Sequence, residues 1–176
     1  MQTRREKSRL GQPLSACSGT GVFVGYASLF GERDSSGDVV MKGAFAHSLR
    51  RRPARDVRML FQHDPAEPVG TWLEMHETER GLHVMGRLDC NVQRARELLS
   101  LLESRGLDGL SIGFRTVAAS RDKVTATRRI NQVDLWEISL VTFPMQHGAR
   151  VSRASLHAGL ASLFRDGAQT IQQGAN

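Results

Sequence analysis

Strand-like segments separated by short turns dominate this chain, without a regular alternation of strands and helices. Most segments are rich in Val, Ile, Phe or Thr and alternate apolar with polar residues, which is typical of half-buried strands. The segments are 20–30, 57–64, 69–77, 81–89, 108–120, 122–131 and 133–143. Because no β-α-β rhythm is present, a doubly wound parallel sheet is disfavoured. The pattern instead predicts an α+β fold, a mostly antiparallel closed β-barrel with a few surrounding helices.

Helical periodicity is confined to three segments. Residues 91–106 carry an apolar stripe at helical spacing, with Asn91 as a candidate N-cap and Gly106 as the residue that ends the helix. A shorter helix is predicted over 42–52, which a proline follows. An amphipathic stretch near 154–164 predicts a short helix close to the C-terminus.

Composition divides the chain into three parts. Residues 1–18 are basic and rich in Ser and Gly, which predicts a flexible leader. Residues 19–152 contain the strand segments and are expected to form the barrel domain, and residues 153–176 are expected to form a helix and a disordered tail. No stretch approaches the roughly 18 consecutive apolar residues of a membrane span, so no membrane partner is expected.

The net charge of +6 is concentrated in two clusters, residues 4–9 and 50–58. Such clusters can bind an acidic protein surface or nucleic acid. Neither cluster has interleaved aromatic residues, and this weakens the case for binding single-stranded nucleic acid. A solvated or protein-docking surface is the preferred interpretation, and specific nucleic-acid binding is disfavoured.

Residues 109–113 read GLSIG, the G-x-S-x-G pattern that surrounds the nucleophilic serine of α/β-hydrolases. That nucleophile elbow needs a strand before the serine and a helix after it. Here a predicted helix precedes Ser111 and strand-like residues follow it, so the match to the elbow is coincidental. Ser111 remains a candidate nucleophile in a different fold.

Strand alternation places Ser111 and Gly113 on the outer face of their strand. The same rule applied to the segment DLWEISLV predicts Trp136 inside, and Glu137 and Ser139 outside. A serine and a carboxylate on the outer wall of neighbouring strands can be parts of one site. Outward polar residues are also what any half-exposed sheet shows, so this pattern alone does not separate the two interpretations.

His63 supplies the residue type that activates a serine. The segment FQHDP places it where a strand runs into a predicted loop containing Pro65 and Pro68. A serine hydroxyl needs a base to take its proton, and imidazole titrates in the right range. A carboxylate on the other ring nitrogen fixes the tautomer. His63, Ser111 and Glu137 supply these three types, although spacing does not show that they meet.

Two further histidines, His76 and His83, flank the T-E-R-G turn and can face each other as a pair of metal ligands. No third ligand is evident, so a cross-strand surface pair is preferred over a metal site. The serine chemistry itself requires no metal and no organic cofactor.

A series of motifs in fixed order resembles the prohead proteases of tailed phages over about residues 21–152. The motifs are GYASLFGERDSSGDVVMKGAFAHSL, MLFQHDPAEPVGTW, GLHVMGRL, LDGLSIGFR, LWEISLVTFP and GARV. The family includes proteases of gene-transfer agents and is similar to the herpesvirus assemblins. The pairing of QHDP with GLSIGF is far more specific than either motif alone.

The resemblance implies a serine endopeptidase that acts inside assembling procapsids in the cytoplasm of the host or producer cell. Its expected partners are the scaffold protein, or the scaffold-like N-terminal region of the major capsid protein precursor, and possible self-cleavage and homo-oligomers are further expectations. A catalytically inactive barrel that binds procapsid or scaffold is the alternative.

The resemblance also carries roles onto single residues. It implies that His63 of QHDP is the base and Ser111 of GLSIGF the nucleophile. Glu137 of LWEIS is the candidate for the third member. The chain reads MQHGARV where a proline commonly stands at position 147, so His147 is kept as the alternative third member.

Overall fold

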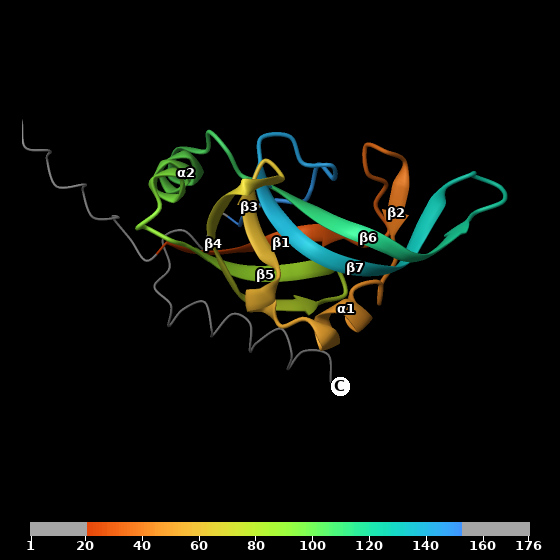
Figure 1. The fold of residues 1–176 in the computed structure, drawn as a ribbon. Helices are drawn as coiled ribbons and strands as arrows, with labels where there is room; N and C mark the ends of the chain where they lie inside the picture. The colour runs from red at the N-terminus through yellow and green to blue at the C-terminus, as the bar shows by residue number, and fades with distance from the viewer. Residues whose placement is uncertain (1–20, 153–176) are drawn as a thin grey trace, which may run out of the picture.

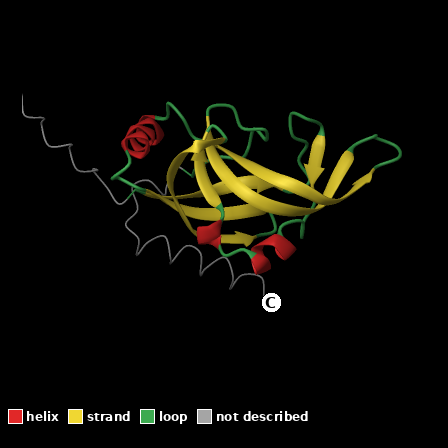
Figure 2. Cartoon of the chain, in the orientation of Figure 1, coloured by secondary structure: helices red, strands yellow, loops and turns green. Residues whose placement is uncertain are grey.

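The computed structural model describes residues 21–152, which form one curled sheet with helices outside it (Figures 1 and 2). The strands are β1 Val22–Leu29, β2 Asp38–Val40, β3 Arg58–Phe61, β4 Asp64–Glu77, β5 Gly81–Leu88, β6 Gly109–Arg121 and β7 Arg128–Val141. The helices are α1 Ala46–Arg51, the short 3-10 helix η1 Ala54–Asp56 and α2 Gln93–Ser104. The predicted leader, C-terminal helix and tail lie outside the described residues. Within residues 21–152 no helix is long and apolar enough to cross a bilayer.

The sheet is mixed rather than wholly antiparallel. Its strands follow the order β1-β5-β4-β3-β7-β2, and β6 pairs with the other edge of β7. Antiparallel pairs dominate, but β2 and β3 both run parallel to β7. Both strands pair with the same edge of β7, β2 near its start and β3 near its end, and α1 lies between them in the chain. The two strands therefore run in the same direction. The mostly-β fold with few helices is therefore confirmed.

The expected closed barrel is not confirmed, because β1 and β6 at the two ends of the curled sheet form no ladder with each other. The segment 149–152 lies between them and makes one isolated bridge to each, Gly25 with Val151 and Gly109 with Arg150. A segment this short supplies only a few backbone hydrogen bonds, such as Tyr26 N–H to the Arg150 carbonyl at 3.1 Å. The sheet thus remains an open, strongly curled half-barrel.

Helix α1 fills the gap between β2 and β3 along the edge of β7. The amide of Leu135 donates to Ser48 Oγ at 2.9 Å, and the amide of Val133 donates to the Ala44 carbonyl at 3.0 Å. The Arg52 guanidinium donates to the Leu135 carbonyl. These contacts satisfy backbone groups of β7 that a neighbouring strand would otherwise satisfy. They therefore stabilise the part of the β7 edge that pairs with neither β2 nor β3.

The core fills the concave side of the sheet. Trp72 and Phe23 are buried there with their rings edge to face, 5.6 Å between centroids. The predicted apolar stripe of α2 is buried, which confirms that helix. Its termini differ from the prediction. Asn91 does not cap it, because its side-chain amide donates to Asp89, and Arg105 rather than Gly106 adopts the left-handed conformation that ends it, with φ 63°.

Two strand boundaries also differ from the prediction. Pro65 and Pro68 do not end a strand but lie within β4, where they are tolerated because this part of β4 pairs with β3 alone, its pairing to β5 beginning at Gly70. The predicted strand over 122–131 begins only at Arg128. Residues before it form a turn in which Asp122 accepts two backbone amide hydrogen bonds.

Candidate active site

His63 lies in the two-residue loop that joins β3 to β4. Gln62 and His63 both have positive φ, 54° and 60°, as a two-residue hairpin loop of type I′ requires, although neither is glycine. Such a conformation costs on the order of 1–3 kcal/mol per residue. Hydrogen bonds from the two loop amides hold it in place, from Gln62 to the Leu140 carbonyl at 3.0 Å and from His63 to Ser139 Oγ at 3.1 Å. The loop therefore fixes the imidazole over β7.

The three predicted site residues come together although they are far apart in the chain. His63 Nε2 lies 3.0 Å from Ser111 Oγ, and His63 Nδ1 lies 2.6 Å from Glu137 Oε1. A carboxylate can only accept, so Nδ1 carries the proton and Nε2 is free to accept from the serine hydroxyl. Ser111 is 3% exposed, the Glu137 side chain 13% and the His63 side chain 43%. The histidine is thus open to solvent on one side while its two partners are mostly covered.

Ser139 connects the parts of this group. It lies directly across from Ser111 in the pairing of β6 with β7 and is fully buried. Its hydroxyl donates to Glu137 Oε2 at 2.6 Å and accepts the His63 amide at 3.1 Å. Sequence alternation placed Ser139 on the correct face but assigned it no role. Its position two residues after Glu137, on the same face, was the available signal.

Gly113 lies directly beneath the Glu137 carboxylate. The two residues are partners in the β6–β7 ladder, and a Cβ added at Gly113 would lie 2.0 Å from Glu137 Oε1. The second glycine of GLSIG therefore leaves room for the carboxylate, which can then lie flat against the strand and reach His63.

Trp136 was predicted inside and is 52% exposed, so that prediction was wrong. The ladder pairs Phe114 with Leu135 but Gly113 with Glu137, so Trp136 is an extra residue that forms a β-bulge. A bulge interrupts strand alternation, and Trp136 turns outward beside Glu137. Its Nε1 donates to Asp134 Oδ2 at 2.8 Å, which holds the exposed indole in place.

A histidine with a serine hydroxyl on one ring nitrogen and a carboxylate on the other is suited to activating the hydroxyl as a nucleophile. The chain matches the family model described as caudovirus prohead serine protease over residues 11–161. It belongs to this family. The match takes in all of the described residues.

Two curated prohead proteases are similar to this family member. The protein of Enterobacteria phage HK97 is 38% identical over 160 residues, which are 89% of this chain and 66% of that protein. The protein of Escherichia phage T5 is 30% identical over 115 residues, which are 64% of this chain and 53% of that protein. The chain thus spans about half to two thirds of the length of the curated relatives it matches.

Solved herpesvirus proteases are more distantly similar to this prohead protease family member. A KSHV protease in complex with a hexapeptide phosphonate inhibitor has a TM-score of 0.49 and 14% identity, covering 74% of this chain and 64% of that one. The varicella-zoster virus protease has a TM-score of 0.47 and 15% identity, covering 82% and 76%.

The loop that follows β7 borders the serine. A Cβ added at Gly109 would lie 2.9 Å from Pro144, so the loop lies against the strand two residues before Ser111. His147 is in this loop and is exposed, and its carbonyl accepts a hydrogen bond from Arg150. Both ring nitrogens of His63 already have partners in Ser111 and Glu137, so Glu137 and not His147 is the residue in contact with the imidazole beside Ser111.

Gln146 ties the same loop to the end of β1, and sequence reasoning missed it. The buried amide makes four hydrogen bonds. Its Oε1 accepts from Ser28 Oγ at 3.0 Å and from the Leu29 amide at 2.8 Å, and its Nε2 donates to the carbonyls of Leu29 at 2.9 Å and Glu32 at 3.1 Å.

Replacing Gln146 by Ala is expected to lower the free energy of unfolding by about 1–3 kcal/mol, because buried groups of β1 lose their partners. Urea unfolding measures this change. Gln93→Ala is the matched control, since Gln93 is exposed on α2 and bonds only to Glu97 there. Equal stability of the two variants would contradict the assigned role.

His76 and His83 face each other across β4 and β5, as predicted for a cross-strand pair, with 5.0 Å between ring centroids. Burial, and after it the neighbouring His76, lowers the pKa of His83. Among residues 21–152 no group of three or more His, Cys, Asp or Glu side chains is arranged to hold a metal ion.

Proposed function

We propose that this chain is a serine endopeptidase of procapsid maturation, with Ser111 as nucleophile, His63 as general base and Glu137 as the acid that orients His63. The observation that carries the proposal is the continuous hydrogen-bonded series from Ser111 Oγ through both nitrogens of His63 to Glu137. Membership of the prohead serine protease family supports the same reaction.

The reaction is an acyl transfer in two halves. His63 Nε2 takes the proton of Ser111 as Oγ attacks the scissile carbonyl, and the imidazolium then gives that proton to the leaving amine. Water attacks the acyl-enzyme in the second half, giving its proton to His63, which returns it to Ser111 Oγ. Glu137 accepts a hydrogen bond from Nδ1–H throughout and stabilises the imidazolium while remaining ionised. No step needs a metal or an organic cofactor.

The proposed substrates are the scaffold protein or the scaffold-like N-terminal region of a major capsid protein precursor, cleaved inside an assembling phage or gene-transfer-agent procapsid in the producing cell. The similar proteins of phages HK97 and T5 are named prohead proteases, which supports this setting. Residues 19–152 are proposed as the protease domain. Self-trimming of the termini and a homo-oligomer belong to the same proposal.

The competing function is an inactive barrel that only binds procapsid or scaffold. A binding module has no need for a serine, a histidine and a carboxylate in line, or for a glycine that makes room for the carboxylate. The geometry therefore favours the enzyme.

A fluorophosphonate probe tests the proposal directly, since such reagents phosphonylate activated serine hydroxyls with loss of fluoride. We expect one labelled peptide by mass spectrometry, the one that contains Ser111, and a rate of labelling lower by about 10³ or more in His63→Ala. The buried Ser139 serves as an internal control and should stay unlabelled. Labelling of another serine, or no labelling, would contradict the assigned nucleophile.

A further inference from the structure

A cationic pocket of about 310 Å³ lies between α1 and the β6–β7 hairpin. Its walls include side chains from α1 and its C-terminal flank, from β6 and from β7. The lining includes His47, Arg51, Arg52, Arg115, Val117 and Asp134. The pocket contains none of the residues assigned to catalysis.

The pocket has a surplus of positive charge. It holds three guanidinium groups and one carboxylate, Asp134, which pairs with Arg52 at 3.3 Å and Arg115 at 3.6 Å. Arg51 forms no ion pair with any residue of the described part of the chain. Planar guanidinium groups gathered in one concave place match the geometry of a carboxylate better than that of an apolar or cationic ligand.

The pocket and the catalytic serine lie on the same face of β6. Ile112 and Phe114 pack against the core, so Ser111 and Arg115 both point to the outer face. They are four positions apart along the strand, a distance of about 13 Å at about 3.3 Å per residue. An extended peptide bound at Ser111 therefore reaches the pocket with a side chain about four residues away.

Glu137 and Trp136 cover the surface between the two places. The Glu137 carboxylate lies over Gly113, and the indole of Trp136 beside it is half exposed and fixed by its hydrogen bond to Asp134. Trp136 thus lies along β7 between the pocket residue Asp134, to which it is hydrogen-bonded, and Glu137, which is the next residue in the chain. The bulge that turns Trp136 outward places an apolar contact on the path from the serine to the arginines.

We propose that this pocket is a specificity subsite that binds an acidic side chain of the substrate, about four residues from the scissile bond. The inference rests on the proposed protease function and adds a substrate preference to it. A peptide carboxylate fits better than a nucleic-acid backbone, because the arginines line one pocket instead of forming a track.

Peptides spanning the cleavage site of a capsid precursor test the subsite. Each position from three to five residues on either side of the scissile bond is made Glu, Gln or Lys in turn, and kcat/KM is measured. We expect kcat/KM to be about five- to tenfold higher for the Glu peptide than for the Lys peptide at a position about four residues from the scissile bond. This preference should occur on only one side of the bond. Arg51→Gln with Arg115→Gln should remove this preference, and Arg51→Glu should shift it toward Lys.

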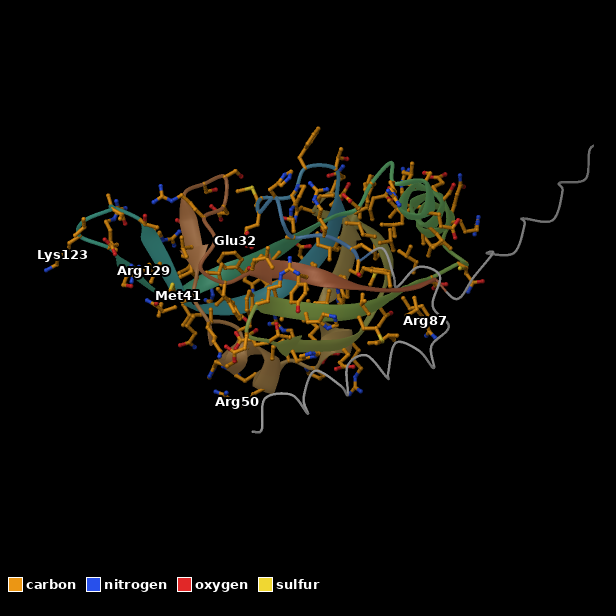
Figure 3. All side chains as sticks on the ribbon, turned by 180° about the vertical axis from the view of Figure 1, so that it is seen from behind. Glu32, Met41, Arg50, Arg87, Lys123 and Arg129 are labelled. Carbon is orange, nitrogen blue, oxygen red and sulfur yellow. The ribbon has the colours of Figure 1, made fainter. Side chains whose placement is uncertain are left out.

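Arg50→Gln is the matched control, because Arg50 belongs to the same helix but does not line the pocket and extends from α1 away from the sheet (Figure 3). It should keep the wild-type preference. Equal cleavage of Glu and Lys peptides by the wild type would overturn the subsite while leaving the protease intact. Failure to cleave any peptide, the Gln series included, would overturn the proposed function and this inference with it. If duplex DNA inhibits cleavage of the Glu peptide and this inhibition is lost in the Arg51→Gln, Arg115→Gln variant, the pocket is a nucleic-acid site and the inference is wrong.

Discussion

Replacing Ser111 by Ala is expected to abolish processing of a co-expressed capsid precursor, with a fall in kcat on the order of 10⁶. The reason is that Ala removes the only atom that attacks the carbonyl, while His63 and Glu137 have nothing left to activate. Gel electrophoresis of the precursor, with mass spectrometry of its new termini, measures the effect.

The fold should tolerate this substitution. Ser111 Oγ contributes one hydrogen bond, to His63, and the loss of a typical hydrogen bond costs only about 1 kcal/mol. Ser120→Ala is the matched control in the same strand, where Ser120 bonds to the exposed Asn131 instead. Processing that persists in Ser111→Ala would sink the protease proposal.

Replacing Gly113 by Ala should also lower activity strongly, even though Gly113 touches no substrate atom in the mechanism. The new methyl group would lie 2.0 Å from Glu137 Oε1, so the carboxylate must move off the strand and away from His63 Nδ1. A displacement of about 1 Å from productive geometry costs about 10² in rate, and losing the orienting carboxylate about 10⁴. We expect kcat to fall within that range.

A double-mutant cycle separates this account from a general loss of structure. Glu137→Gln alone should lower kcat by about 10⁴. Adding Gly113→Ala to Glu137→Gln should then change little, because the carboxylate that Gly113 accommodates is already gone. Additive losses would mean that Gly113 acts by another route, and full activity of Gly113→Ala would contradict the tight contact beneath Glu137.

Much of the fold could be predicted because its signals are local. The apolar stripe of α2 and the alternation that marks the β4–β5 hairpin come from side chains close in sequence. The errors occur where a distant partner decides. Pro68 resembles a strand breaker, yet it is tolerated since β5 does not pair with that part of β4. The residues before Arg128 contain strand-forming Val and Thr, but Asp122 captures their amides in a turn.

The residue types of the candidate site could be predicted from the sequence. The neighbouring residues that hold them in place, such as Ser139 and Gly113, could be predicted less well. Motif and chemistry predicted Ser111, His63 and Glu137 as site residues, and the structure brings the three side chains together. Alternation placed the serine and the carboxylate on the outer face. Trp136 was misplaced because alternation assumes an unbroken ladder, and the bulge becomes visible only when β7 is paired with β6.

The sequence by itself determined which groups are available and which face of its strand Ser111 occupies. Only the tertiary structure decided that the side chains of Ser111, His63 and Glu137 meet. His63 and Glu137 are 74 positions apart, and their contact depends on the parallel register of β3 with β7 and the antiparallel register of β6 with β7. A slip of one residue in either ladder would turn the side chains to the opposite face. Register is set by packing between distant segments, so no local pattern specifies it.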